Sequence, residues 1–560
     1  MVKHPALCLL LLFPFVSALT GFSQSLPVGT PLLEETARRL QISGAVSNNT
    51  SFSIRPLYAY SPEDIDSLYN PQNWLAGMAK PTRLKYAKGK GDLVFLPATI
   101  KQQYNSHHPY GWNDGSMIQA KGYQAQASVG VYTKIGPLSI QLQPEFVYAQ
   151  NASFEEFPAW QNDTLWKHYY YILNRIDNPE RFGNGSYTKV FAGQSSVRFN
   201  YKKLSIGVST ENLWWGPGIR NSLLLSNTAP GFPHITFNTL APVTTGIGSF
   251  EWQVVSGWTK GSGILPPDTS RTFDGIRLYE PKQADSKRYM NGMIVTWQPK
   301  WTRNLYLGLS RMFYVYSSDM EKSLDGYLPI FGALFKGKAR GEDEKRRDQL
   351  LSVFARLVLP KEKAEFYAEF GRNDHAQNFT DLMLEPEHAR AYIIGGRKIF
   401  TTTKKTDVEL MFEITQLENS PTAWLRPQEG WYTHYQVRHG YTHRGQVIGA
   451  GIGPGSNSQT LGISWIKGIK KLGFTLERVV RNNDFYYEAF VPMQNPRFHW
   501  VDLSLNAYKN WYCKRFIYSA NLSFVRSLNY QWIYKLDAAG KEVHTNVNQL
   551  HASLSVSYVF

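Results

Sequence analysis

The chain has 560 residues, 14% of which are aromatic, a formal net charge of +16 and a mean hydropathy of −0.35. Beyond its N-terminus no stretch is long and apolar enough for a transmembrane helix, which excludes a helical membrane protein. The positive charge indicates acidic surroundings, for which outer-leaflet phosphates and acidic polysaccharide are candidates. The sequence shows no nucleic-acid motif, and we expect no nucleic-acid partner.

The N-terminus predicts a cleaved secretory signal peptide over residues 1–23. Lys3 and His4 give a positive start, residues 6–18 are almost continuously apolar, and small residues precede Gln24. This apolar run is too short to serve comfortably as a membrane anchor. After cleavage Cys513 is the one remaining cysteine, so no internal disulfide or cysteine metal cluster can form. We expect no cofactor.

Residues 24–115 are predicted to form a small periplasmic segment with short helices. Thr30 and Pro31 can begin a helix, and Gly44 can end it. Residues 61–64 resemble the start of a second short helix.

Residues 116–560 are predicted to form a transmembrane antiparallel β-barrel, an all-β fold. Their apolar and polar residues alternate with period two, as in residues 408–414, where Glu409 and Glu413 stand between apolar residues and fall on the opposite face. Glutamates on the polar face would point into a wet or hydrogen-bonded lumen. The length fits roughly 16–20 strands, and an even number is expected.

The C-terminal strand is the sharpest evidence for a bacterial outer-membrane location. Leu554, Val556, Tyr558 and the terminal Phe560 share one face, and serines occupy the other. A terminal aromatic residue after alternating apolar residues resembles the signal that barrel-assembly machinery reads on outer-membrane proteins of Gram-negative bacteria. We therefore expect that machinery, outer-membrane lipid and lipopolysaccharide as partners.

Three segments do not have the pattern of plain barrel wall. Residues 110–115 contain the turn sequence Asn-Asp-Gly. Residues 211–234 contain two tryptophans followed by Gly-Pro-Gly, which cannot form an ordinary strand and is expected to fold into the lumen or across its mouth. Residues 431–457 are rich in Tyr, His and Gly, but their histidines lack a convincing carboxylate partner, so we expect no metal.

These segments, together with Glu369-Phe-Gly-Arg-Asn-Asp374, resemble the capsule-assembly Wzi family in its Bacteroidetes-like form. The stretch from Trp214 to Pro233 is the most specific match. The resemblance implies an eighteen-stranded outer-membrane barrel with a periplasmic helical part and a blocked lumen. It also implies a lectin-like role, in which the protein binds, anchors or organises exported capsular polysaccharide.

The leading hypothesis from the sequence is therefore a non-enzymatic barrel that binds surface polysaccharide. Aromatic rings can stack on sugar faces, while amides and guanidinium groups bind hydroxyls and carboxylates. The positive charge would favour an acidic glycan, whose binding should weaken with salt. The candidate contacts, which could equally plug the lumen, are Trp214, Trp215, Arg220, Asn221, His234, Arg372, Asn373, His434, Tyr441, His443 and Arg444.

Two alternatives remain open. A channel or porin is compatible with the barrel size. An outer-membrane hydrolase is a weaker alternative, because the chain has no Gly-x-Ser-x-Gly elbow and its potential catalytic residues are widely scattered.

Overall fold

The structure is a computed structural model that describes residues 23–45, 49–59, 82–332, 345–373, 379–402, 406–420, 423, 426, 428–493, 498–536, 539 and 542–560. Residues 1–22 of the predicted signal peptide and the second helix start at 61–64 lie outside these ranges. None of the helices within the described ranges has the length and apolar character needed to cross a membrane.

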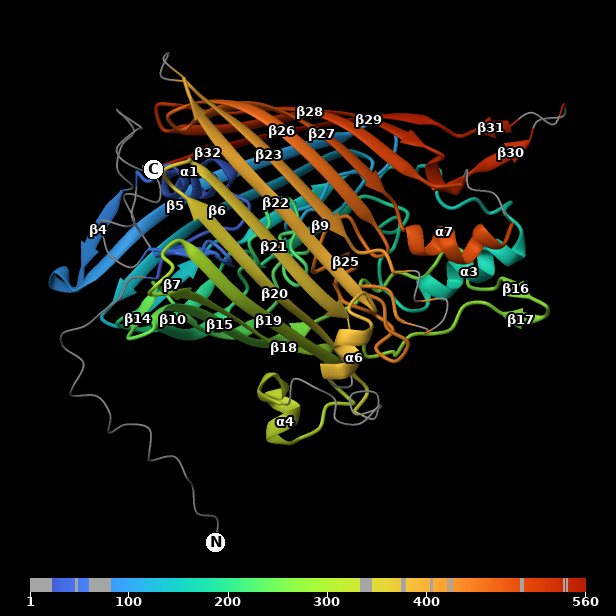
Figure 1. Cartoon of the computed structure of the whole chain (residues 1–560), viewed down its shortest axis with the longest axis horizontal. Helices are drawn as coiled ribbons and strands as arrows, with labels where there is room; N and C mark the ends of the chain where they lie inside the picture. The colour runs from blue at the N-terminus through green and yellow to red at the C-terminus, as the bar shows by residue number, and fades with distance from the viewer. Residues whose placement is uncertain are drawn as a thin grey trace, which may run out of the picture.

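The described chain forms a closed antiparallel barrel of 18 strands (Figure 1). The sheet closes where the last strand pairs with the first, as Ser553 opposite Gln103 illustrates. Three barrel strands are interrupted and consist of the pairs β7 with β8, β9 with β10, and β13 with β14. The wall consists of β5 (Gly91–Asn105), β6 (Gly122–Ile135), β7 (Leu138–Leu142), β8 (Glu145–Ala149), β9 (Tyr187–Phe191), β10 (Ser196–Tyr201), β11 (Leu204–Ser209), β13 (His234–Thr239), β14 (Val243–Thr245), β15 (Gly248–Thr259), β18 (Arg288–Pro299), β19 (Leu305–Tyr316), β20 (Arg347–Leu359), β21 (Ala364–Asn373), β22 (Arg390–Thr401), β23 (Asp407–Gln416), β26 (Asn457–Lys467), β27 (Lys470–Val480), β28 (Val501–Cys513), β29 (Phe516–Leu528) and β32 (Val547–Tyr558).

The predicted barrel is thus confirmed, but its wall begins earlier than residue 116. β5 starts at Gly91, and a short strand, β4 (Arg83–Tyr86), pairs with its first residues. The sequence hides β5 because it contains Pro97 and a register shift between Leu96 and Thr99, which interrupt the alternation.

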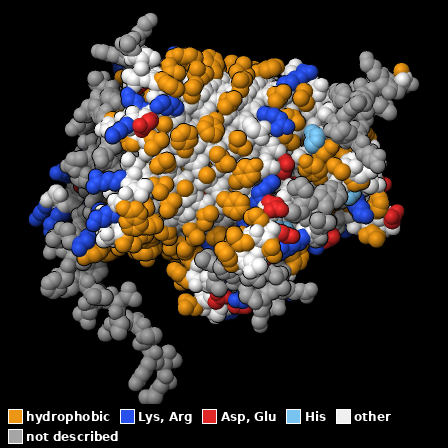
Figure 2. All heavy atoms as spheres, in the orientation of Figure 1, with side chains coloured by type: hydrophobic (Ala, Val, Ile, Leu, Met, Phe, Trp, Pro, Cys, Tyr) orange, Lys and Arg blue, Asp and Glu red, His pale blue; other side chains and the backbone are white. Residues whose placement is uncertain are grey.

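Alternation along each strand separates a membrane face from a lumenal face. In β29, Leu522 and Phe524 are each 51% exposed on the outside, whereas Ser523 and Ser527 are buried inside. The last strand follows the same rule, with Leu554 outside. Figure 2 shows hydrophobic side chains spread over the outer face of the strands that it displays. A protein with such an outer surface needs lipid around it.

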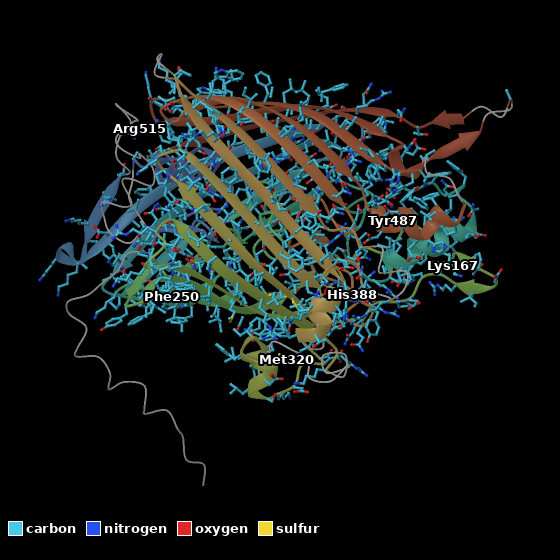
Figure 3. The ribbon with its side chains drawn as sticks, viewed as in Figure 1. Lys167, Phe250, Met320, His388, Tyr487 and Arg515 are labelled. Atoms are coloured by element: carbon cyan, nitrogen blue, oxygen red, sulfur yellow. The ribbon has the colours of Figure 1, made fainter. Side chains whose placement is uncertain are left out.

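The two ends of the barrel differ in the length of their connections. Short turns such as 202–203 and 514–515 lie at the end that carries the C-terminus, which we call the short-turn end. Long connections lie at the other, the long-loop end, and include α3 (Asp163–Leu173), α4 (Leu324–Tyr327), α6 (Phe379–Leu384) and α7 (Asn483–Ala489). In Figure 3, Arg515 marks the first end and Tyr487 the second. In outer-membrane barrels the short turns face the periplasm.

The positive charge is concentrated at the short-turn end. Figure 2 shows lysine and arginine side chains gathered there, on the left. The basic side chains gathered at this end face away from the long loops, and the preference for an acidic glycan that the net charge suggests stays a prediction. The basic turn residues include Lys88, Lys90, Lys202, Lys203, Lys300, Arg303, Lys361, Lys363, Lys470, Lys514 and Arg515.

The lumen is filled by four segments that we call the plug: the described residues of 23–59, and residues 106–121, 210–233 and 428–456. The first segment carries the predicted N-terminal helix, α1 (Pro31–Ile42). The sequence predicted a small periplasmic segment with short helices. In the structure α1 lies against the inner side of the wall near the short turns, where Arg38 pairs with Glu365. Four short strands belong to the plug in or beside this segment: β1 (Ser25–Leu26), β2 (Ile54–Arg55), β3 (Leu57–Tyr58) and β12 (Trp214–Trp215).

A buried ion cluster fixes this helix to the wall. Glu365 on β21 is fully buried, and its carboxylate bonds three guanidinium groups. Nε of Arg38 on α1 lies 3.0 Å away, Nη2 of Arg356 2.7 Å and Nε of Arg397 2.6 Å. Because buried charges are tolerated when they are paired, the cluster specifies where α1 sits.

Candidate functional site

The paired tryptophans predicted as sugar contacts lie inside the plug. β12 pairs with β2, which places Trp214 opposite Arg55 and Trp215 opposite Ile54. Trp215 is fully buried, and its Nε1 donates to Oε1 of Gln253 on the wall at 2.8 Å. This arrangement is the lumen-filling alternative that the sequence left open.

The Gly-Pro-Gly turn after these tryptophans wraps around a wall carboxylate. Glu413 on β23 accepts hydrogen bonds from the backbone N–H groups of Ile219 at 2.7 Å and Asn221 at 2.8 Å. Arg220 bonds Glu477 on β27 at 3.0 Å, and its side chain remains one-third exposed. Asn221 is therefore a buried structural residue, whereas Arg220 still faces open space.

The other predicted residues are dispersed through the lumen and do not form one site. His234 on β13 is buried with its Nδ1 2.7 Å from the carbonyl oxygen of Phe232, and Asn373 donates to the carbonyl oxygen of Gly430 at 3.0 Å. Tyr441 is fully buried and stacks on Tyr432. The remaining four are buried or partly buried at plug contacts, namely Arg372, His434, His443 and Arg444.

A cavity of about 210 Å³ opens at the long-loop end instead. It lies between α3, the connection before β28, and η6 (Tyr530–Trp532), which follows β29. Figure 1 shows α3 and α7 side by side there, and the two helices contact each other. The cavity therefore sits on the plug and faces away from the short turns.

Local sequence explains why these two helices form. The side chain of Asn162 caps α3 by accepting from the backbone N–H of Leu165 at 2.9 Å, and Asn482 caps α7 in the same way. Each helix then buries aromatic residues on one face, so that the two share a core. This aromatic core contains Phe157, Trp166, Tyr169, Phe485, Tyr486, Phe490, Phe498 and Trp532.

Aromatic side chains form much of the cavity lining. Trp500 is partly exposed, and its ring lies edge-on to Trp532 and to Tyr530, each at 5.1 Å between centroids. The ring of His108 also packs against Tyr530, with 4.6 Å between the ring centroids. The Nε1 of Trp532 and the Nε2 of His108 have no hydrogen-bond partner among the described residues.

Polar groups are fixed around these rings. Nε of Arg481 bonds Asp502 at 2.8 Å, and the Nε1 of Trp500 donates to the same carboxylate at 3.0 Å. Glu180 accepts from the Tyr169 hydroxyl and from Gln531 Nε2, the latter at 2.8 Å. Flat rings with rigid carboxylate, guanidinium and amide groups at their edges are suited to polyhydroxylated ligands.

Burial raises the pKa of Glu180 to about 7. The folded protein therefore holds this proton more tightly than the unfolded chain, so the stabilisation is complete below about pH 4.5 and declines as pH rises through 7. We expect the denaturation midpoint in detergent to fall between pH 5 and pH 8, and Glu180→Gln to flatten part of this profile. Burial also raises the pKa of Asp484 to about 7, so this residue contributes a second part of the fall in the denaturation midpoint. Identical pH profiles for wild type and variant would contradict the assignment.

The sequence does not reveal this cavity because its lining residues come from six separate connections. The tryptophans Trp500 and Trp532 stand singly in the sequence, next to no Gly-Pro-Gly or repeated-histidine pattern. The one available signal was the concentration of aromatic residues in the loops that follow β8, β27 and β29. Among the described residues, no group of three or more potential ligands could hold a metal ion.

Comparison with known proteins identifies the family. The model of the family "Capsule assembly protein Wzi" matches residues 96–527. The fold is similar to that of Wzi from Escherichia coli, described as an outer-membrane protein involved in group 1 capsule assembly and as a carbohydrate-binding β-barrel. That comparison has a TM-score of 0.58 at 12% identity and covers 97% of this chain and 100% of the other.

Acinetobacter baumannii OccAB1 is more distant, with a TM-score of 0.39 at 8% identity over 86% of this chain and 99% of its own. No curated protein sequence gives a significant match. Since the family model covers well over half of the chain, this outer-membrane barrel belongs to the capsule assembly protein Wzi family.

Proposed function

We propose that this protein binds the exported polysaccharide of its own cell surface in the cavity at the long-loop end, without cleaving it, and so anchors or organises that polysaccharide. The observation that carries the proposal is the partly exposed Trp500 beside Tyr530 and Arg481 in a cavity that faces away from the periplasmic turns. Family membership supports the same role in capsule assembly.

The test is the affinity of detergent-purified protein for surface polysaccharide isolated from its source. We expect Trp500→Ala to weaken binding at least tenfold, because the ring that would stack on a sugar is lost; tenfold corresponds to about 1.4 kcal/mol. Calorimetric titration measures the change, and a heat-modifiable band shift verifies that each variant remains a folded barrel.

Phe379→Ala is the matched control, since Phe379 on α6 is 62% exposed at the same end but does not line the cavity. The control should bind as the wild type does. Equal affinity of wild type and Trp500→Ala would remove the cavity from the binding site.

The filled lumen disfavours the channel alternative. Wall and plug share one buried core that includes Trp215, Leu223 and Trp431 from the plug and Met312 and Ile393 from the wall. We therefore expect the wild type to produce no steady conductance in planar bilayers, in contrast to a porin of comparable size. Stable open-channel currents from the folded protein would favour transport and would contradict this account of the lumen.

A further inference from the structure

A second cavity, of about 430 Å³, lies within the barrel between the plug and one part of the wall. Its volume falls within the range of small-molecule sites, about 300–1,000 Å³. Apart from Tyr508 and His551, the wall residues that line it on β28, β29 and β32 are short and mostly polar, and they leave a gap where longer side chains would meet the plug. They include Asn506, Asn510, Ser519, Asn521, Ser523 and Ser553.

The plug side of this cavity is built by the motif at residues 110–115, whose Asn-Asp-Gly sequence predicts a turn. Asn113 and Gly115 have positive φ values of 62° and 64°, so the motif does turn sharply. Both Trp112 and Asp114 line the cavity as a result. The proposed function does not use these residues.

Three rigid contacts hold the motif in place. Oδ1 of Asp114 accepts from Lys101 Nζ at 2.5 Å and from Gln103 Nε2 at 2.7 Å. The guanidinium of Arg220 lies 5.2 Å from the centre of the Trp112 ring and is bonded to Glu477. The cavity therefore presents polar groups whose positions are fixed before any ligand arrives.

Unsatisfied donors provide a second, independent observation. Trp214 lines the cavity and is 3% exposed, yet its Nε1 has no hydrogen-bond partner among the described residues. The Nε1 of Trp112 is in the same situation. Buried donors of this kind normally find an acceptor, from the protein, from water or from a ligand.

The ions around the cavity come largely in pairs, which determines the chemical class of the ligand. Lys101 pairs with Asp114, Arg220 with Glu477, and Arg55 with Glu34. Each pair can bond hydroxyl groups, but together the pairs offer no surplus charge to an ion. Aromatic rings, amides and hydroxyls complete a lining suited to an uncharged sugar.

We call the cavity at the long-loop end the outer cavity and this lumenal one the inner cavity. We propose that the inner cavity is a second saccharide-binding site, which takes one or two uncharged sugar units. This proposal goes beyond the proposed function, because the inner cavity can be occupied whether or not the outer cavity binds polysaccharide. The two cavities lie on opposite sides of a single layer: His108 lines the outer one, Tyr110 lines the inner one, and Arg481 of the outer cavity lies 5.8 Å from the Trp112 ring.

The test uses oligosaccharides of one repeating unit, prepared from the surface polysaccharide of the source, and titrates them into the full-length barrel in detergent. Ser553→Trp fills the inner cavity from the wall. Ala552→Trp is its matched control, because the neighbouring side chain faces the membrane side of the same strand. Asn521→Leu gives a milder filling if the larger substitution disturbs folding, which heat modifiability reports.

We expect two binding sites in the wild type, of which Ser553→Trp and Asn521→Leu abolish or weaken one at least tenfold, while Ala552→Trp keeps both. Trp500→Ala should remove the other site and leave the inner one intact. Binding lost in Trp500→Ala but unchanged in both filling variants would overturn the inner site alone. Binding unchanged in Trp500→Ala but lost in the filling variants would uphold the inner site while the proposed outer site fails. No binding by folded wild type would overturn both.

Discussion

Glu365→Ala is expected to release the N-terminal segment from the barrel. The substitution removes the shared carboxylate from three buried guanidinium groups, those of Arg38, Arg356 and Arg397. Of these, Arg397 keeps a longer contact with Glu409, at 3.6 Å. Removing one partner of a buried ion pair costs about 3–5 kcal/mol, and here three partners are affected at once. Denaturant titration in detergent should show a loss of at least that size, and limited proteolysis should cut residues 23–59 first.

Glu362→Ala is the control for this experiment. Glu362 lies in the neighbouring short turn, and its side chain is exposed, so its removal should change stability by less than about 0.5 kcal/mol. If Glu365→Ala were as stable and as resistant to protease as Glu362→Ala, the ion cluster could not be what fixes α1 in the lumen.

Trp215→Ala is expected to destabilise the plug without changing polysaccharide affinity. The ring is fully buried in the core shared by plug and wall, and truncating such a side chain costs about 3–5 kcal/mol. Because Trp215 has no exposed surface and lies away from the outer cavity, the variant that folds should bind polysaccharide as the wild type does. Denaturation midpoints and calorimetric affinities measured on the same preparation separate the two effects.

Trp301→Ala serves as the comparison, since that ring is 70% exposed on a short turn. It should leave both stability and affinity close to the wild-type values. A large loss of affinity in folded Trp215→Ala would return Trp215 to the binding site and would contradict its assignment to the shared core of plug and wall.

The barrel could be predicted from the sequence because its cause is local. A strand with one face in lipid and one in the lumen must alternate, and β29 and the C-terminal strand show this directly. The start of α1 is also local, since Thr30 is its N-cap residue and Pro31 its first residue. The strand β5 was missed where a register shift breaks the alternation, which a periodicity argument cannot follow.

The binding site was harder to predict, because it depends on contacts between distant segments. Two adjacent tryptophans beside an arginine look the same in a sequence whether they bind a ligand or fill the lumen. The sequence therefore does not show that Trp215 bonds Gln253 of the wall. Conversely, Trp500 and Tyr530 become one surface through a contact between two loops. The charge of +16 has a similar limit, since composition does not reveal at which end of the barrel the charge lies.

The most direct test of the central claim, that the long-loop end binds polysaccharide, is an experimental structure of the wild type with a repeating-unit oligosaccharide bound. We predict sugar density in the outer cavity, with a ring against Trp500 and hydroxyls within hydrogen-bonding distance of Arg481 or Glu180. An oligosaccharide bound elsewhere on the long loops, with the outer cavity empty, would contradict the account.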